Sequence, residues 1–218
     1  MKYYEAYDKR YRQVHEYGVS WSSRTPTPIV EEMIRNYAPD EEILDLGCGE
    51  GRDILYLLQE GYTCYGVDVS AEAIRYCRTQ MPEKSENFRI LDICRDTMDH
   101  SFGFIYSVAV LHMLIEDADR RQFYRFIRRH LKEGGYALIC TMGDGDTEFT
   151  TDPAQAYTDV TRMHQESGQE MSVASTSCRM VSRETFRREL AENNFRIVEE
   201  GITEALPDFN RLMYAVVL

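Results

Sequence analysis

Residues 43–52 read Ile43-Leu44-Asp45-Leu46-Gly47-Cys48-Gly49-Glu50-Gly51-Arg52, an apolar strand that runs into a glycine-rich turn. Glycines let the backbone turn sharply and approach a ligand without a clash of Cβ atoms. An amphipathic stretch follows the turn, so the turn opens a helix whose free N-terminal amides attract negative charge. A strand, a glycine turn and a helix in this order favour a nucleotide-binding α/β fold.

Carboxylates end the two strands that follow this turn. Asp68 lies at the end of the second strand, and Asp92 lies at the end of the third. A carboxylate in the position of Asp68 can accept hydrogen bonds from two ribose hydroxyls, and it would repel a 2′-phosphate. The glycine turn and the two aspartates therefore predict a single cleft shaped for a nucleoside.

The rest of the chain alternates short apolar runs with longer amphipathic stretches. The apolar runs lie at 43–46, 63–69, 88–93, 102–111, 136–142, 195–199 and 212–218, and the amphipathic stretches at 27–37, 52–60, 71–80, 117–132 and 183–193. This alternation predicts an α/β fold with a doubly wound, seven-stranded, mostly parallel sheet and helices on both faces. Residues 200–211 contain Pro207 and lack helical periodicity. We therefore expect an antiparallel last strand, joined to the preceding strand by a hairpin.

A length of 218 residues predicts a single domain. Two segments lie outside the alternation, and long segments between core elements often form lids and substrate walls. Residues 1–26 are aromatic, with Tyr3, Tyr7 and Tyr11 at helical spacing; we expect them to form a lid over the site, with core packing as the alternative. Residues 143–181 are polar and hold three glycines, and we expect them to cover the substrate.

Charge and composition disfavour several classes of protein. The chain has 25 basic and 37 acidic residues, a net charge of −12. An acidic protein repels a phosphate backbone. The arginines of residues 120–132 are expected on the solvent-exposed face of an amphipathic helix. We therefore expect no nucleic-acid partner. No apolar run approaches the roughly 20 residues of a membrane span, and none resembles a signal peptide. The six scattered cysteines predict no metal site and a cytoplasmic location.

The Asp-x-Gly-x-Gly-x-Gly loop with Asp68 and Asp92 resembles the class I (Rossmann-like) methyltransferases that depend on S-adenosylmethionine (SAM). The resemblance covers residues 27–218, including Glu133-Gly134-Gly135 before the fifth strand. The loop, with Tyr56-Leu57 on the helix after it, is similar to small-molecule enzymes of the tellurite-resistance and thiopurine-methyltransferase kind. The resemblance implies SAM as cofactor, S-adenosylhomocysteine (SAH) as product and a small-molecule methyl acceptor. It leaves open which atom of the acceptor is methylated, and whether the protein is a monomer or a homodimer.

The resemblance also implies which residues hold the methionine part of SAM. They lie at the carboxyl ends of the first and fourth strands and on the glycine turn. Arg52 either approaches the carboxylate of the cofactor or faces solvent as an ordinary helix arginine. The residues implied are Asp45, Gly47, Cys48, Gly49, Gly51, Arg52, Ser107 and Val108.

The adenosine part is implied to lie at the ends of the second and third strands. Asp68 would bind the ribose hydroxyls, with Val69 against the adenine. Asp92 would accept a hydrogen bond from the adenine amino group, and the amide of Ile93 would donate one to the ring. Trp21 of the aromatic N-terminal segment completes the expected cofactor site.

Three side chains are candidate catalytic groups. His112 follows the fourth strand, where the family often places an active-site residue, and it can take a proton from a hydroxyl, amine or thiol. The alternative is a histidine packed at the start of a helix. Tyr11 belongs to the tyrosine stripe, whose rings can surround a sulfonium cation, and His15 lies in the same segment.

Two other functions compete with methyl transfer. A nicotinamide-dependent oxidoreductase is disfavoured because Gly51 follows Gly49 by two positions, where that class has three. A non-catalytic protein-binding module is disfavoured because the glycine loop and both strand-end carboxylates are intact. Methyl transfer is therefore the preferred interpretation.

Overall fold

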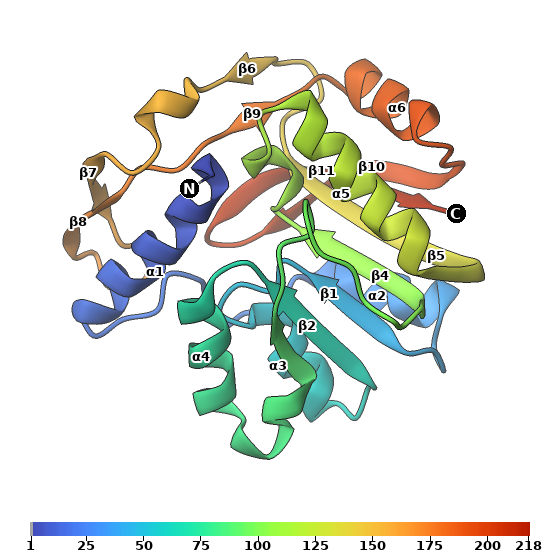
Figure 1. Cartoon of the computed structure of the whole chain (residues 1–218), viewed down its shortest axis with the longest axis horizontal. Helices are drawn as coiled ribbons and strands as arrows, with labels where there is room; N and C mark the ends of the chain where they lie inside the picture. Colours follow the sequence, from blue (N-terminus) through green and yellow to red (C-terminus); the bar gives the residue numbers. More distant parts are fainter. Residues whose placement is uncertain (1) are drawn as a thin grey trace.

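A central seven-stranded sheet runs through the molecule in the order β10-β11-β5-β4-β1-β2-β3 (Figure 1). The structure is a computed structural model that describes residues 2–218. Strand β11 is antiparallel to both of its neighbours, β10 and β5, and the other strand pairs are parallel. The strands are β1 (Ile43–Leu46), β2 (Cys64–Asp68), β3 (Phe88–Ile90), β4 (Phe102–Val108), β5 (Leu131–Met142), β10 (Ile197–Ala205) and β11 (Phe209–Val217). The predicted α/β fold, with its reversed last strand, is confirmed.

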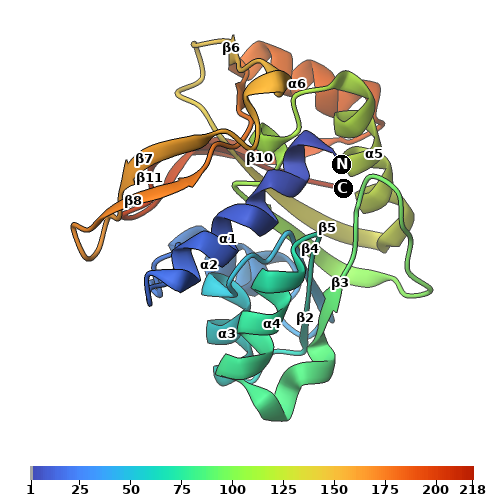
Figure 2. The ribbon, with the colours of Figure 1, turned by 60° about the vertical axis from the view of Figure 1, so that its left-hand side comes forward.

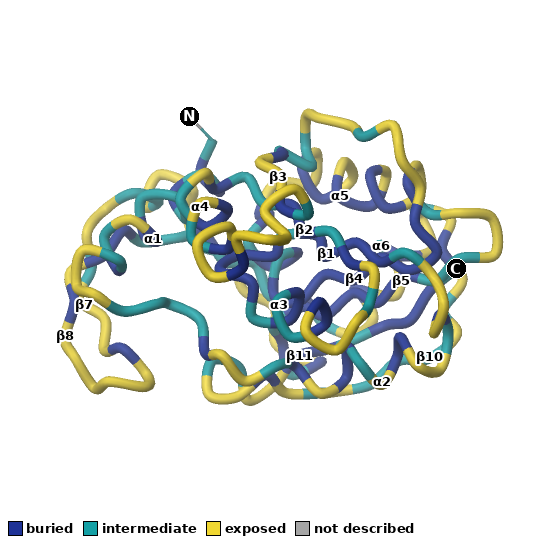
Figure 3. The backbone as a smooth tube through the Cα atoms, turned by 90° about the horizontal axis from the view of Figure 1, so that it is seen from below, coloured by how far each residue is buried: buried dark blue, intermediate teal, exposed yellow. Residues whose placement is uncertain are grey.

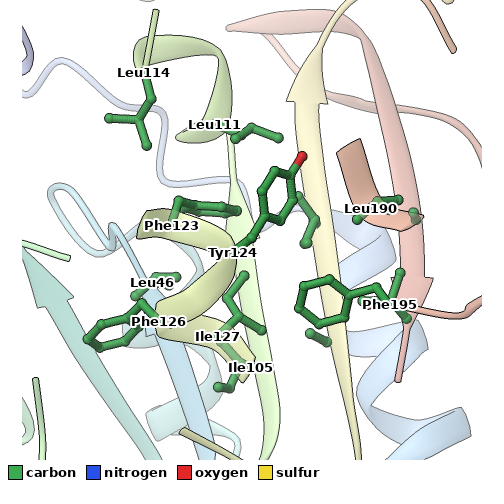
Figure 4. Packing of buried hydrophobic residues seen from close by; sticks show 14 of the residues in the cluster. Leu46, Ile105, Leu111, Leu114, Phe123, Tyr124, Phe126, Ile127, Leu190 and Phe195 are labelled. Atoms are coloured by element: carbon green, nitrogen blue, oxygen red, sulfur yellow. The ribbon is translucent and has the colours of Figure 1, made fainter. Parts of the chain in front are cut away.

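Helices cover both faces of this sheet (Figure 2). One face carries α2 (Pro28–Tyr37), α3 (Arg52–Gln59) and α4 (Ala71–Gln80), and the other carries α5 (Asp117–His130) and α6 (Arg183–Glu192). Figure 4 shows how Phe123, Phe126 and Ile127 of α5 pack toward Leu46 and Ile105 of the sheet. Burying a side chain of this size contributes roughly 1.5–3 kcal/mol, so this apolar stripe holds α5 in place.

Arg120 is an exception to the expectation that the arginines of α5 face solvent. Its side chain is buried, and its Nε and Nη2 donate to the carboxylate of Glu189 on α6 at 2.9 and 2.6 Å. Its Nη1 donates to the carbonyl of Leu111 at 2.8 Å. Arg121, Arg125, Arg128 and Arg129 are exposed, as expected.

The two segments outside the alternation lie side by side. The N-terminal one forms η1 (Tyr3–Glu5) and α1 (Ala6–Glu16), and the other holds η4 (Pro153–Gln155) and two small antiparallel sheets. One sheet pairs β6 (Phe149–Thr150) with β9 (Arg179–Met180), and the other pairs β7 (Asp159–Met163) with β8 (Glu170–Ala174). Strand β8 packs against α1, while much of the β7–β8 hairpin is exposed (Figure 3).

Several predicted strand boundaries differ from the structure, and β5 begins at Leu131 and not at residue 136. Strand β3 ends at Ile90, because the backbone amides of Arg95 and Asp96 donate to the carbonyl of Asp92 and close a turn there. Strand β4 ends at Val108 and is followed by η3 (Leu111–Met113). The final hairpin is much longer than predicted, because every position of the outer strand β10 except Ala205 is partly or fully exposed, and the strand gives only a weak apolar signal. The remaining short helix, η2 (Pro82–Asn87), leads into β3.

Candidate active site

A cavity opens where β1, β2 and β4 end, and the glycine turn and both strand-end carboxylates line it. Its outer wall comes from η1 and α1, which contribute Tyr4, Tyr7 and Tyr11, and from the connection between β10 and β11, which contributes Asp208. The predicted site residues that line it are Tyr11, Trp21, Asp45, Gly47, Cys48, Gly49, Arg52, Asp68, Val69, Asp92, Ile93 and Val108.

At two positions of the glycine turn, a neighbouring side chain lies too close to leave room for a Cβ atom. Gly47 has φ +82°, and a Cβ there would lie 2.4 Å from Cγ2 of Val110. Gly49 has φ +53°, and a Cβ there would lie 2.8 Å from the hydroxyl of Tyr11. The side chain of Tyr11 on α1 therefore packs directly on the backbone of the turn.

Asp68 connects the glycine turn to the end of β2. Its carboxylate accepts hydrogen bonds from the amides of Gly49 at 2.9 Å and Ser70 at 2.8 Å. Burial raises the pKa of Asp68, although these amide donors act in the opposite direction. A carboxylate has about four lone-pair sites, so acceptor capacity remains for two vicinal hydroxyls in the cavity.

The carboxylate of Asp92 accepts hydrogen bonds from the N-terminal segment and from the turn that follows β3. Its carboxylate accepts hydrogen bonds from the hydroxyl of Tyr4 at 3.0 Å and the amide of Cys94 at 2.9 Å. Tyr4 is buried, and the loss of solvent raises the pKa of its hydroxyl, so this hydroxyl remains a donor. The carboxylate is partly exposed and lines the cavity together with Ile93.

Arg52 lies at the start of α3 and is the one basic side chain in the cavity lining. Its guanidinium pairs with Asp208 at 3.2 Å and with Asp53 at 3.6 Å. Among residues 2–218, no group accepts a hydrogen bond from its buried Nε. A buried N–H that lacks an acceptor is costly, so the guanidinium is suited to receive a further carboxylate. The alternative of a solvent-facing arginine does not fit, because the side chain is only 10% exposed.

Asp45 is the buried carboxylate at the end of β1. It accepts a hydrogen bond from the hydroxyl of Tyr106 at 2.8 Å. Burial, with a contribution from the nearby Asp53, raises the pKa of Asp45 well above its usual range. Ser107 on β4 was also predicted to hold the methionine part of SAM. Its hydroxyl donates to the carbonyl of Leu46 at 2.9 Å, and it does not line the cavity.

Gly51 and two predicted catalytic residues also lie outside this lining. Gly51 begins α3, where a Cβ would meet Leu55 and Cys77. His112 is buried in η3, with its ring edge-on to Phe209 at 5.8 Å. Burial, followed by the charge of Arg120, lowers the pKa of His112 to about 3, so its ring is neutral. The position of His112 agrees with the packing alternative and not with a base that faces the cavity.

His15 of α1 lies between two carboxylates, one on the glycine turn and one on α4. Its Nε2 is 2.7 Å from Glu50 of the glycine turn, and its Nδ1 is 2.6 Å from Glu72 of α4. The ring stacks on Tyr76 at 4.9 Å. Both nitrogens are therefore engaged by carboxylates outside the cavity lining, an arrangement that a proton acceptor for a substrate would not have.

Residues 143–181, expected to cover the substrate, contribute no side chain to the lining of this cavity. They contact α1 on its outer side instead: Arg10 donates to the carbonyl of Ala174 on β8, and Gln13 accepts from the amide of the same residue. The polar composition of this segment follows from that role, because a hairpin that supports a surface helix needs few apolar residues.

Several residues of the site were missed by the sequence analysis. Glu50, Asp53, Asp208 and Phe209 contact or line the site, yet none had been singled out. Glu50 occupies a variable position between two glycines. Asp208 lies in the connection before β11 and Phe209 begins β11; neither belongs to a motif, so only the hairpin geometry brings them to the cavity.

Comparisons with known proteins agree with this architecture. Residues 44–139 match the family described as a methyltransferase domain. The 2-heptyl-1-hydroxyquinolin-4(1H)-one methyltransferase of Mycobacteroides abscessus is 31% identical over 98 residues, which cover 43% of each chain. A probable SAM-dependent methyltransferase, TehB of Haemophilus influenzae, is 29% identical over 100 residues, which cover 45% of this chain and 35% of that protein. These matches span less than half of the length of either relative.

The fold extends the likeness beyond the matched segment. The glycopeptide N-methyltransferase MtfA, in a structure with SAM, superimposes with a TM-score of 0.65 over 89% of this chain and 87% of that one, at 16% identity. The chain therefore has the fold of this methyltransferase, and its residues 44–139 are similar to the methyltransferase-domain family. In residues 2–218, no helix has the length and apolar character that crossing a membrane requires.

Proposed function

We propose that the chain transfers the methyl group of SAM to a small-molecule acceptor by in-line displacement. The observation that carries the proposal is that Gly49, Asp68, Asp92 and a buried guanidinium N–H of Arg52 without a hydrogen-bond acceptor meet around one cavity. SAM supplies a methyl group already activated by a sulfonium. The protein need only orient the acceptor and exclude water.

Each cofactor-binding role follows from a group in the lining. Asp68 has acceptor capacity for the ribose, and Asp92 has it for the adenine amino group. Arg52 has an Nε–H that lies 3.6 Å from Asp53 and has no hydrogen-bond acceptor among residues 2–218, so it can donate to the carboxylate of the methionine part. Burial raises the pKa of Tyr7 and of Tyr11, so both hydroxyls are donors that position groups and are not bases.

The covering of the cavity supports a small acceptor. Tyr4, Tyr7 and Tyr11 lie between the glycine turn and solvent, so a polymer would have to displace η1 and α1. The M. abscessus relative is named for a quinolone, which agrees with an acceptor of this size.

The charges of the lining further restrict the acceptor. Its charged residues are Asp45, Asp53, Asp68, Asp92, Asp208 and Arg52. An anionic acceptor would meet repulsion from this set, whereas a neutral or cationic one would not. The five histidines all lie within residues 2–218, and none lines the cavity. The proposed acceptor therefore carries its own lone pair, as a neutral amine or thiol does.

Calorimetry with SAM and SAH tests the cofactor part of the proposal. We expect micromolar binding of both ligands that is lost in Asp68→Ala and retained in Asp40→Ala, a change at an exposed residue. Absence of binding to the wild type would overturn the proposal.

Methyl-labelled SAM incubated with metabolite fractions tests the acceptor. Labelled amines or thiols are expected, and exclusive labelling of carboxylates or of polymers would contradict the acceptor class. A cytoplasmic location, and a monomeric or dimeric state, stay predictions.

A further inference from the structure

Glu50 is a buried carboxylate inside the glycine turn, with no part of its side chain in the lining of the cavity. It is 4% exposed, and its hydrogen bonds go to residues of the N-terminal segment, defined here as residues 2–22. Its Oε1 accepts from the amide of Trp21 at 3.0 Å and faces Nε2 of His15 at 2.7 Å. Its Oε2 accepts from the amide of Ser22 at 2.7 Å.

These bonds make the carboxylate of Glu50 a connection between the glycine turn and the N-terminal segment, each of which contacts the cavity through other residues. On one side, Gly49, directly before Glu50, donates its amide to Asp68. On the other side, Tyr11 and Trp21 of the N-terminal segment line the cavity. A displacement of the segment would leave Glu50 without three hydrogen-bond partners, and a buried charge without partners is strongly unfavourable.

We propose that Glu50 is a positioning residue that couples closure of the N-terminal segment to cofactor binding. The inference rests on the proposed function. The cofactor would contact the glycine turn on its cavity side, and Glu50 fixes the segment to the same turn from outside the cavity lining. By linkage, whatever stabilises the closed segment strengthens cofactor binding, and the cofactor stabilises the closed segment to the same extent.

His15 supplies the positive partner that makes a buried carboxylate tolerable at this position. Its second nitrogen bonds to Glu72 on α4, which in turn pairs with Arg75. The coupling therefore depends on the His15–Glu50 pair, and removal of either member should disrupt it.

A double-mutant cycle in the full-length protein tests this coupling. The variants are Glu50→Gln, His15→Gln and the combination, with Glu16→Gln as the matched control, because Glu16 is exposed on the same helix. Each single variant is expected to raise the Kd for SAH by about fivefold or more, the usual range for site coupling. The double variant should bind no more weakly than the weaker single variant, because both substitutions break the same pair.

The fluorescence of Trp21 provides a second readout. Trp21 is the only tryptophan of the chain, and its backbone amide bonds to Glu50. SAH should change its emission in the wild type and in Glu16→Gln, and the change should be reduced in Glu50→Gln. A merely structural role would lower the Tm of the variants without changing the Kd.

Tryptic cleavage after the exposed Arg24 tests the coupling without any variant. Saturating SAH is expected to slow this cleavage in the wild type. An unchanged cleavage rate, a wild-type Kd in both single variants, or independent effects that multiply in the double variant would each overturn the coupling. A wild type that binds no SAH would contradict the proposed function itself.

Discussion

The hydroxyl of Tyr4 donates a hydrogen bond to Oδ2 of Asp92 at 3.0 Å, across 88 positions of the sequence. The N-terminal segment therefore bonds directly to the carboxylate at the end of β3. Tyr4→Phe removes the donor and leaves the ring in place, so we expect a loss of about 1.5 kcal/mol in the free energy of unfolding. Urea denaturation measures this, with Tyr65→Phe as control, because Tyr65 packs against Phe102 outside the cavity. Equal losses in both variants would contradict the prediction.

Gly47 meets Val110 so closely that an added methyl group has no room. We expect Gly47→Ala to lower the free energy of unfolding by roughly 2 kcal/mol, since strain at φ +82° adds to the clash with Val110. Part of this loss should be recovered in Gly47→Ala/Val110→Ala, although Val110→Ala alone is destabilising. Denaturation of the three variants measures the recovery, and purely additive losses would show that the contact is unimportant.

The Arg52–Asp208 pair joins the start of α3 to the final hairpin at 3.2 Å, with side chains that are 10% and 15% exposed. Arg52→Met leaves Asp208 without its cationic partner, and we expect a loss of about 3 kcal/mol in the free energy of unfolding. Burial already raises the pKa of Asp208, and loss of Arg52 should raise it further. Arg52→Met/Asp208→Asn should be more stable than Arg52→Met, as measured by thermal unfolding at pH 7. A double variant that is less stable than the single one would refute this account.

The His15 pair predicts a pH dependence of stability. Burial alone would lower the pKa of His15, but the hydrogen bonds that its ring donates to the carboxylates of Glu50 and Glu72 outweigh it, and the pKa is raised. The ring of His15 also stacks on Tyr76. Arg75 influences it indirectly, because its guanidinium donates a hydrogen bond to Glu72. Glu72 remains ionised over this range, since hydrogen bonds with Arg75 and His15 hold its pKa at about 2.

A raised histidine pKa gives a stabilisation that is complete below the unfolded value of about 6.5 and is lost as the pH rises through the folded value. We therefore expect the wild type to exceed His15→Gln in unfolding free energy most strongly near pH 6, with a smaller difference at pH 9. Denaturation curves at the two pH values measure this. A difference that grows with pH would have the wrong sign.

The number and direction of the sheet strands were predictable from the sequence because each depends on a local pattern. Apolar runs mark β1 and β4, glycines mark the turn after β1, and Asp68 marks the end of β2. The absence of a helix before β11 marks the reversed strand. These signals lie within a few residues of the features that they specify.

The arrangement around the cavity was less predictable because it depends on contacts between distant segments. Nothing near Glu50 shows that its carboxylate accepts from residues 28 and 29 positions earlier. Likewise, His112 follows β4 as an active-site residue would, but its ring packs against Phe209 of the final hairpin. In both cases the tertiary packing, and not the local pattern, decides the direction of the side chain.

Helix α1 is held from two sides, and this has a consequence for turnover. Asp8 accepts hydrogen bonds from Ser70 and Glu72 at the start of α4, while Arg10 and Gln13 bond to Ala174 on the β7–β8 hairpin. The helix cannot move outward alone, because the hairpin must either release it or travel with it. In the proposed reaction we therefore expect product release to involve a segment more than 150 residues away from α1 in the sequence, and we expect substitutions at the tip of that hairpin to alter the rate of exchange without changing a residue of the cavity lining.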